Sequence, residues 1–153
     1  MYIIKKLEQY NDNYIYFCEP IKNNIMQDGV FTRILYSNMN IVFNGIYLEI
    51  PFHDIIFEKY YNKYKCSFNI NNSINKDIFE KIRIIEENIL KKYIHCNKAS
   101  TFKIYEHIRN GNIKIFCESV PKTNSVLVLK ISGLWETLSN YGLTYKFIIL
   151  NHL

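Results

Sequence analysis

The sequence predicts an α+β fold, mainly antiparallel sheet, with one long amphipathic helix inserted between strands and a second, short helix. Many short runs of β-branched and aromatic residues alternate with turn residues, which is typical of antiparallel strands joined by short connections. One segment, Asp77–Ile94, has helical periodicity instead. The chain has 153 residues, of which 48% are hydrophobic and 22% charged. That composition supplies enough apolar surface for one core, so we expect a single domain over residues 1–153.

The first strands are indicated by short apolar runs. Tyr2–Leu7 and Tyr14–Cys18 flank the polar turn Gln9–Asn13 and predict an opening hairpin, which Pro20 ends. A further strand is expected over Val30–Ser37. On it, successive side chains point to opposite faces, so one face carries Phe31, Arg33 and Leu35 and the other Thr32, Ile34 and Tyr36.

The clearest local turn signal is Asn44-Gly45. After a turn at Asn38–Asn40, the runs Ile41–Phe43 and Ile46–Ile50 lie on either side of this dipeptide. Asn-Gly readily adopts the positive φ angles of a type I′ turn, so the sequence predicts a tight hairpin here, ended by Pro51.

A second alternating pattern runs from Tyr60 to Ile70. It predicts a strand with an apolar face of Tyr60, Tyr64, Cys66, Phe68 and Ile70, and an opposite face of Tyr61, Lys63, Lys65 and Ser67. The preceding run, Asp54–Lys59, fits a helical turn or a loop, and the residues do not decide between them.

The long helix is expected over Asp77–Ile94, with Asp77 and Glu80 as a capping pair at its start. Its apolar stripe comprises Ile78, Ile82, Ile85, Ile89 and Tyr93. The neighbouring Glu86 and Glu87 point to different faces of the helix, so they do not form a two-carboxylate active site. The remaining charges have both signs, which is typical of a solvated face.

The last third of the chain predicts one more helix and three strands. The helix spans Thr101–Arg109 and ends at Asn110-Gly111. The strands span Asn112–Cys117, Val126–Ser132 and Leu143–Leu150. We expect the connection Gly133–Gly142, which holds Trp135, to be an ordered turn. Many short antiparallel strands favour a barrel or sandwich, and a helix placed between the strands of a barrel is the OB-like layout.

Motifs for catalysis or metal binding are not found in the sequence. It contains no nucleophile elbow, phosphate-binding loop, dinucleotide fingerprint or zinc-protease helix motif. The four cysteines, Cys18, Cys66, Cys96 and Cys117, are scattered without a metal-ligand spacing and are expected to be reduced thiols. We therefore predict no enzyme activity, no metal site and no cofactor. No apolar run is long enough for a membrane span and the start lacks a signal-peptide pattern, so we expect a cytosolic protein without a membrane partner.

The positive functional signal is the combination of aromatic and basic residues. The chain has a formal net charge of +5 and 16% aromatic residues. Proteins that bind single-stranded nucleic acid stack bases on aromatic rings and neutralise phosphates with lysine or arginine. The residues that fit this pattern are Arg33, Tyr61, Lys63, Lys65, Lys130, Trp135 and Lys146. The alternative is that the aromatic residues fill the core, the lysines only solubilise an outer face, and an AT-rich genome accounts for part of the composition.

Two of these assignments have specific alternatives. Trp135 could be a stacking platform or could close the end of a barrel against Tyr141. Arg109 and Lys114, on either side of the Asn110-Gly111 turn, could contact phosphate or could simply be solvated.

Two stretches carry a resemblance to known proteins. They are Glu19–Asn23 running on to Phe31–Ser37 and Asn44–Tyr47, and Leu129–Glu136 with Tyr141–Phe147. Together they resemble a group of small, uncharacterised proteins from nucleocytoplasmic large DNA viruses of the mimivirus and phycodnavirus kind. These viruses also encode OB-fold single-stranded DNA-binding proteins of the phage type. That type has an acidic C-terminal tail, whereas this chain ends in Ile148–Leu153.

The residues and the resemblance lead to two hypotheses. The first is a viral OB-like module that binds single-stranded DNA with little sequence preference. The second is a virion-associated structural or interaction protein, such as a minor capsid or assembly component, that pairs with a like chain or with virion proteins through an edge strand such as Tyr2–Leu7. The resemblance implies a location in the host cytoplasm, at the viral factory, or in the virion.

Overall fold

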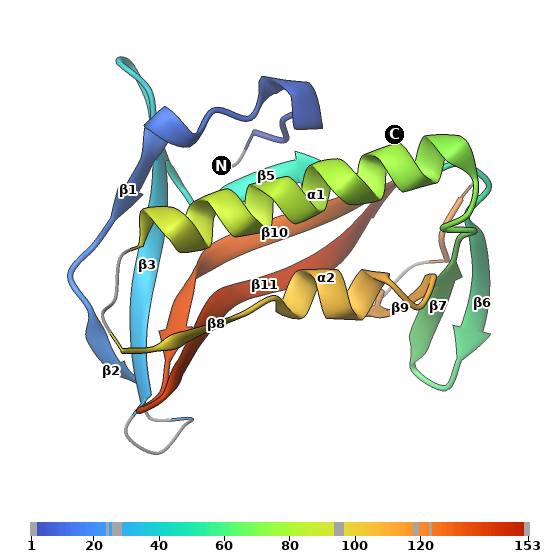
Figure 1. Cartoon of the computed structure of the whole chain (residues 1–153). Helices are drawn as coiled ribbons and strands as arrows, with labels where there is room; N and C mark the ends of the chain where they lie inside the picture. Colours follow the sequence, from blue (N-terminus) through green and yellow to red (C-terminus); the bar gives the residue numbers. More distant parts are fainter. Residues whose placement is uncertain are drawn as a thin grey trace.

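The computed structural model describes residues 3–23, 25, 29–93, 97–117, 120–122 and 124–151. It shows an α+β protein made mostly of strands, with one long helix between strands and one short helix, as predicted (Figure 1). The helices are α1 (Ser73–Lys92) and α2 (Lys103–Ile108), and two 3-10 turns lie at Leu7–Gln9 and Asp12–Tyr14. The strands are β1 (Ile15–Phe17), β2 (Ile21–Asn23), β3 (Gly29–Ser37), β4 (Val42–Asn44), β5 (Ile46–Glu49), β6 (Ile56–Tyr60), β7 (Lys63–Ser67), β8 (Ala99–Thr101), β9 (Asn112–Phe116), β10 (Ser125–Glu136) and β11 (Asn140–Asn151).

The strands form a large curled sheet and a small one. The large sheet is a half-barrel with the order β1-β3-β10-β11-β8, and β2, β4 and β5 pair along the edges of β3 and β10. Its pairings are antiparallel except that of β8 with β11, which is parallel. The small sheet has the order β6-β7-β9 and is antiparallel throughout. In Figure 1, α1 lies across the hollow of the curled sheet, and the small sheet stands at one end of it.

The apolar stripe of α1 packs against the inner face of the large sheet. Ile78, Ile82, Ile85 and Ile89 are buried, as the helical periodicity predicts. The start of the helix is wrong in the prediction. The Asn72 side chain accepts hydrogen bonds from the backbone N–H groups of Ile74 and Asn75, so Asn72 is the N-cap and the helix begins at Ser73. The Asp77 carboxylate instead pairs with Lys81, one turn further along.

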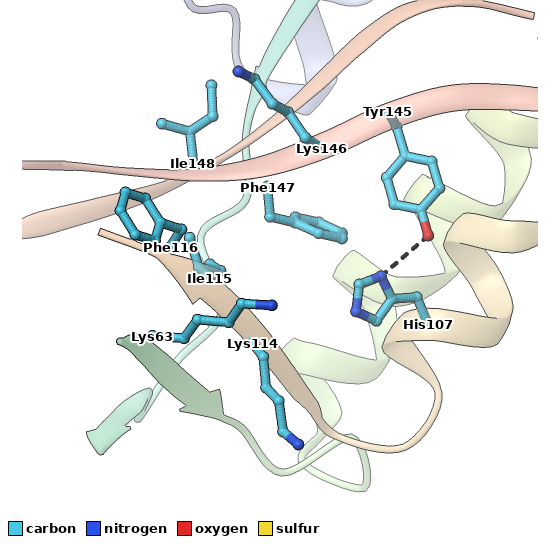
Figure 2. Close-up of a pocket in the computed structure, with 9 residues that line it drawn as sticks. All are labelled: Lys63, His107, Lys114, Ile115, Phe116, Tyr145, Lys146, Phe147 and Ile148. Carbon is cyan, nitrogen blue, oxygen red and sulfur yellow. Dashed lines mark hydrogen bonds between the residues drawn. The ribbon is translucent and has the colours of Figure 1, made fainter. Parts of the chain in front are cut away.

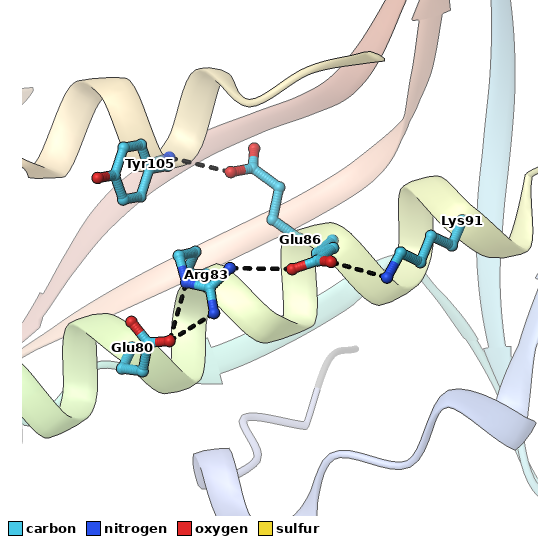
Figure 3. Close-up of polar contacts among 6 residues, drawn as sticks. Glu80, Arg83, Glu86, Lys91 and Tyr105 are labelled. Atoms are coloured by element: carbon cyan, nitrogen blue, oxygen red, sulfur yellow. Dashed lines mark hydrogen bonds and ion pairs between the residues drawn. The ribbon is translucent and has the colours of Figure 1, made fainter.

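Most charged side chains on the solvent-facing side of α1 form ion pairs with one another. Arg83 binds the carboxylates of Glu80 and Glu87, and the Lys91 ammonium lies 2.7 Å from Glu87 (Figure 3). The lysine at position 81 pairs with Asp77 and with Glu8, 3.3 Å from each. The mixed charges of this helix therefore form a solvated ion-pair network, as expected.

The two hairpins expected in the first half are not formed. Tyr2 lies outside the described residues, and of the rest of Tyr2–Leu7 only Lys5 makes a bridge, parallel to Leu48. Strand β1 pairs with β3 instead. At Asn44-Gly45 the chain turns a corner rather than a hairpin, because β4 pairs with β3 whereas β5 pairs with β10. Gly45 does have the positive φ, +98°, that such a corner requires.

The connection predicted at Gly133–Gly142 is mostly strand. Strand β10 continues to Glu136 after a bulge between Ile131 and Gly133, and β11 begins at Asn140. Gly133 and Gly142 lie within the strands, and an aromatic ring from the neighbouring strand packs directly over each of them. A Cβ at Gly142 would lie 2.7 Å from the ring of Trp135, and one at Gly133 would lie 2.6 Å from the ring of Phe31. Because β10 includes position 135, Trp135 is a strand residue and not part of a turn.

The small sheet and α2 complete the end of the molecule. The run Asp54–Lys59, left open in the sequence, contributes most of β6. Helix α2 starts two residues later than predicted, because Thr101 belongs to β8. Gly111, with φ +78°, follows the helix as expected and leads into β9. No helix among the described residues has the length and apolar character needed to span a membrane.

Candidate nucleic-acid interface

The seven residues predicted to bind nucleic acid lie on two surfaces. Four of them, Arg33, Lys130, Trp135 and Lys146, are on the outer face of the large sheet, opposite α1. The strand register places Lys130 directly beside Lys146 and Tyr47, and Trp135 directly beside Phe31 and Gly142. Lys63 and Lys65 are on the small sheet, and Tyr61 is at the tip of its hairpin.

The small sheet presents a solvent-facing surface that we name the basic-aromatic face. Cross-strand pairing brings Lys63 beside Tyr60 and Phe116, and Lys65 beside Lys114. Phe116 is 63% exposed and Tyr60 45% exposed. The Lys114 ammonium lies 4.2 Å from the centre of the Tyr60 ring, a cation–π contact. The basic-aromatic face comprises Tyr60, Lys63, Lys65, Lys114 and Phe116, and Glu58 lies opposite Lys65 on its outer strand.

The predicted position of Tyr61 on this strand face is wrong. Tyr61 and Asn62 form a tight turn between β6 and β7, and Tyr61 has a φ of +54°. The turn places Tyr60 opposite Lys63, so Tyr60 supplies the ring that was expected from Tyr61. The Tyr61 ring is 82% exposed and contacts the Tyr60 ring edge-on, 4.9 Å between centres.

A groove of about 500 Å³ separates the small sheet from the large one. Among the described residues, β9 pairs only with β7, and β11 beyond Gly142 pairs only with β10, so an unpaired edge of each strand borders this space. We name it the β9–β11 groove. It is lined by Lys63, His107, Lys114, Ile115, Phe116, Tyr145, Lys146, Phe147 and Ile148 (Figure 2). The groove joins the basic-aromatic face to Lys146 on the large sheet.

The charge of the groove is unbalanced. Its lining includes three lysines and no carboxylate. Lys63, Lys114 and Lys146 form no ion pair with any carboxylate in the described part of the chain, unlike Lys81, Arg83 and Lys91 on α1. Ammonium groups that have no carboxylate partner attract an anionic ligand most strongly, because binding does not first have to break an ion pair.

One end of the groove is formed by a small aromatic cluster. The rings of His107, Tyr145 and Phe147 meet with centres 5.4 to 6.0 Å apart. The Tyr145 hydroxyl lies 3.1 Å from His107 Nδ1 and donates to the carbonyl oxygen of Lys103, also at 3.1 Å. Burial, helped by the charge of Glu86, raises the pKa of Tyr145 to about 12, and burial lowers the pKa of His107. Both groups are therefore neutral near pH 7.

Trp135 does not close the end of a barrel. Its ring packs over Gly142 on the outer face, whereas Tyr141 points to the inner face and donates a hydrogen bond to the carbonyl oxygen of Leu90. Trp135 is half-buried beside Phe31, whose ring lies over Gly133. On the same face the Lys130 ammonium lies 5.5 Å from the centre of the Tyr47 ring, and the Arg33 guanidinium donates to Asn44 at 2.8 Å.

The cysteines and histidines do not gather into a site within the residues that the structure describes. Cys66 is buried, and desolvation raises the pKa of its thiol to about 12, so it is inert at neutral pH. Cys18 and Cys117 are half-buried cysteines that form no disulfide. His95 and Cys96 lie outside the described residues. No group of three or more metal-ligating side chains occurs in the described part of the chain. The prediction that the protein is not an enzyme stays a prediction.

Several residues of the groove were not among the predicted binding residues. The sequence indicates Lys114 only as a possible phosphate contact beside the Asn110-Gly111 turn, and it does not single out Phe116, His107 or Tyr145 for binding. The alternation in β9, with Ile113 and Ile115 buried and Lys114 and Phe116 outward, could have indicated the first two. The pairing of β9 with β7, and the approach of α2 to β11, are long-range and have no local signal.

Comparisons of the chain with family models, with curated proteins and with solved structures find no match.

Proposed function

We propose that this protein binds single-stranded nucleic acid with little sequence preference. The strand would lie in the β9–β11 groove and across the basic-aromatic face. The observation that carries the proposal is the groove itself, which combines three lysines that have no described carboxylate partner with an exposed Phe116 ring. Lysines along a groove neutralise successive phosphates, and an exposed ring stacks on any base.

The shape of the site favours a single strand over a duplex. A groove of about 500 Å³ between two strand edges has room for part of an extended strand, with its bases turned toward the aromatic rings, but not for a duplex. The presence of aromatic rings beside the cations distinguishes this surface from one that only contacts a phosphate backbone.

The relationship to OB-like modules and the viral origin are part of the same proposal. A curled sheet with a helix inserted between strands supports the OB-like relationship. The resemblance to proteins of nucleocytoplasmic large DNA viruses supports DNA as the ligand and a location at the viral factory or in the virion.

The first test is charge removal in the groove. Replacing Lys63, Lys114 and Lys146 with glutamine should weaken binding of labelled oligo-dT on the order of a hundredfold at about 50 mM salt, because three phosphate contacts are lost. For the wild type, the logarithm of affinity should fall with the logarithm of salt concentration with a slope of about −2 from these three contacts. Fluorescence anisotropy measures both quantities.

The matched control removes the same charge elsewhere. Lys22 on β2 and Lys76 and Lys92 on α1 are exposed and away from the groove, and their replacement with glutamine lowers the net charge equally. This control should retain nearly all the affinity for oligo-dT. Equal losses in the two triple variants would show that only net charge attracts the ligand, and the absence of micromolar binding by the wild type in low salt would refute the proposal.

A role in assembly is the second candidate. The β3–β4 hairpin and the adjoining β1 carry exposed apolar side chains, with Tyr16 62% and Val42 61% exposed. Exposed apolar groups of this size favour contact with a like chain or a virion protein. The edge strand that was expected for this role, Tyr2–Leu7, is not a strand in its described part. A stable oligomer in light scattering that dissociates in Tyr16→Ser/Val42→Ser would support this candidate.

A further inference from the structure

The hydrogen bonds of Tyr145 determine that Nδ1 of His107 carries a hydrogen. A tyrosine hydroxyl has one hydrogen, and the Lys103 carbonyl oxygen can only accept, so that hydrogen is donated to Lys103. Toward His107 the hydroxyl must then act as acceptor, which means that Nδ1 of His107 carries a hydrogen. Because burial lowers the pKa of His107, the ring is neutral near pH 7, and its second nitrogen, Nε2, is an acceptor.

Nε2 of His107 faces a groove whose charged side chains are all hydrogen-bond donors. Lys63, Lys114 and Lys146 can only donate, and the Tyr145 hydroxyl already makes two hydrogen bonds. Figure 2 shows the second ring nitrogen of His107 pointing away from Tyr145, toward the side of the groove from which the Lys63 side chain reaches in. The isoleucine and phenylalanine side chains of the lining supply no polar atom.

We infer that His107 is the residue of the groove that hydrogen-bonds a base, with Nε2 accepting from an N–H group of that base. This inference rests on the proposed function. Phosphates and sugar ring oxygens have no N–H to offer, whereas each of the four bases has at least one on its pairing edge. A single acceptor therefore detects that a base is present without selecting its identity, which agrees with little sequence preference. Phe116, at the other end of the groove in Figure 2, stacks on a different base of the strand.

The decisive experiment compares two oligonucleotides of equal charge and length. Thymine has one N–H on its pairing edge, at N3, and N3-methylthymine has none. The wild type should bind oligo-dT about fivefold more tightly than oligo-N3-methyl-dT, the effect of one hydrogen bond. His107→Phe keeps a ring against Phe147 and removes the acceptor, so it should bind both equally. His107→Gln supplies an acceptor oxygen and should retain part of the difference.

The pH profile separates this role from a purely structural one. The titratable groups around His107 are Tyr145 on β11 and the lysines at 63, 114 and 146, and Glu106 is its neighbour on α2. Protonated His107 donates from Nε2, so the difference between the two oligonucleotides should disappear below the pKa of His107 while the affinity for both rises.

The outcomes distinguish this inference from the proposed function. Equal binding of both oligonucleotides by the wild type refutes the role of His107 and leaves the binding function standing. An undiminished difference in His107→Phe, shown to be folded by circular dichroism, assigns the contact to another acceptor and also refutes it. If the wild type binds neither oligonucleotide, the inference and the proposed function fail together.

Discussion

Replacing Gly133 with alanine should destabilise the protein by about 3 kcal/mol, at the upper end of the cost of overpacking a core. A Cβ at this position would overlap the carbonyl oxygen of Thr32 and would lie 2.6 Å and 2.7 Å from two ring carbons of Phe31. The Phe31 ring can rotate, but the Thr32 oxygen belongs to the backbone of β3. Strand β3 would have to separate from β10, where Gly133 pairs with Arg33, to make room for a methyl group.

The measurement is urea unfolding, followed by the fluorescence of Trp135, the sole tryptophan. Gly142→Ala is the matched control, because its Cβ would meet the Trp135 ring at 2.7 Å and the Thr101 carbonyl oxygen at 3.0 Å. Since a side chain can move where a strand cannot, we expect Gly142→Ala to cost less stability and to change the Trp135 emission of the folded protein. A Gly133→Ala protein as stable as the wild type would contradict the register of β3 and β10.

The elements that could be predicted from the sequence are those whose signal is local. In β3 the alternation of Thr32, Ile34 and Tyr36 with the outward residues is reproduced, because one face of the strand is buried in the core. The isoleucine stripe of α1 is reproduced for the same reason. Because one face of each element is buried, apolar residues recur with the period of a strand or a helix, and that period identifies the buried face from the sequence.

The elements that were wrong depend on partners far away in the chain. Asn44-Gly45 has the sequence of a tight hairpin, yet β4 and β5 do not pair with each other. Strand β5 pairs with the long apolar strand β10, and the dipeptide only changes the direction of the chain between β4 and β5. Gly133 and Gly142 were interpreted as turn residues because glycine usually marks a turn. Here each leaves space for an aromatic ring from the neighbouring strand, a use of glycine that depends on strand pairing.

The sequence indicated which types of residue form the candidate site, but not which of them the fold would bring together. Lys63 and Lys146 both fit the pattern of charge, and the fold brings them to one groove although they are 83 positions apart in the sequence. Arg33 and Trp135 met the same criterion and lie on the outer face of the large sheet, but they do not line the groove. A pattern of charge and aromaticity indicates an outward face, and only long-range pairing decides which outward faces meet.

Replacing Glu86 with alanine should cost about 3 kcal/mol, because one buried and one partly buried backbone N–H group would lose their partner. Glu86 on α1 is fully buried, and its carboxylate accepts hydrogen bonds from the backbone N–H groups of Ile104 at 2.9 Å and Tyr105 at 3.0 Å (Figure 3 draws the second). Phe102, the N-cap residue of α2, provides no side-chain cap. A residue of one helix therefore caps the other, and it holds the helix that carries His107.

The same carboxylate gives stability a specific pH dependence. Burial raises the pKa of Glu86 above its usual value, and the two backbone hydrogen bonds only partly oppose this shift. As the pH rises from the unfolded-state value near 4.5, the unfolded chain loses this proton before the folded protein does. The contribution of Glu86 to stability therefore falls with rising pH across that window and is constant above the folded-state pKa. The stability of the wild type relative to Glu86→Gln, measured as the difference between their urea midpoints, should therefore fall between about pH 4 and pH 7, because groups that titrate in both proteins cancel in this difference.

Glu86→Gln also separates capping from charge. Its amide oxygen can accept one of the two hydrogen bonds, so it should be more stable than Glu86→Ala at every pH while remaining uncharged. If α2 depends on this cap, both variants should weaken binding of oligo-dT, Glu86→Ala more than Glu86→Gln, because α2 forms one wall of the β9–β11 groove through His107. A variant that loses stability but binds oligo-dT like the wild type would show that the groove does not need α2, and it would remove His107 from the site as well.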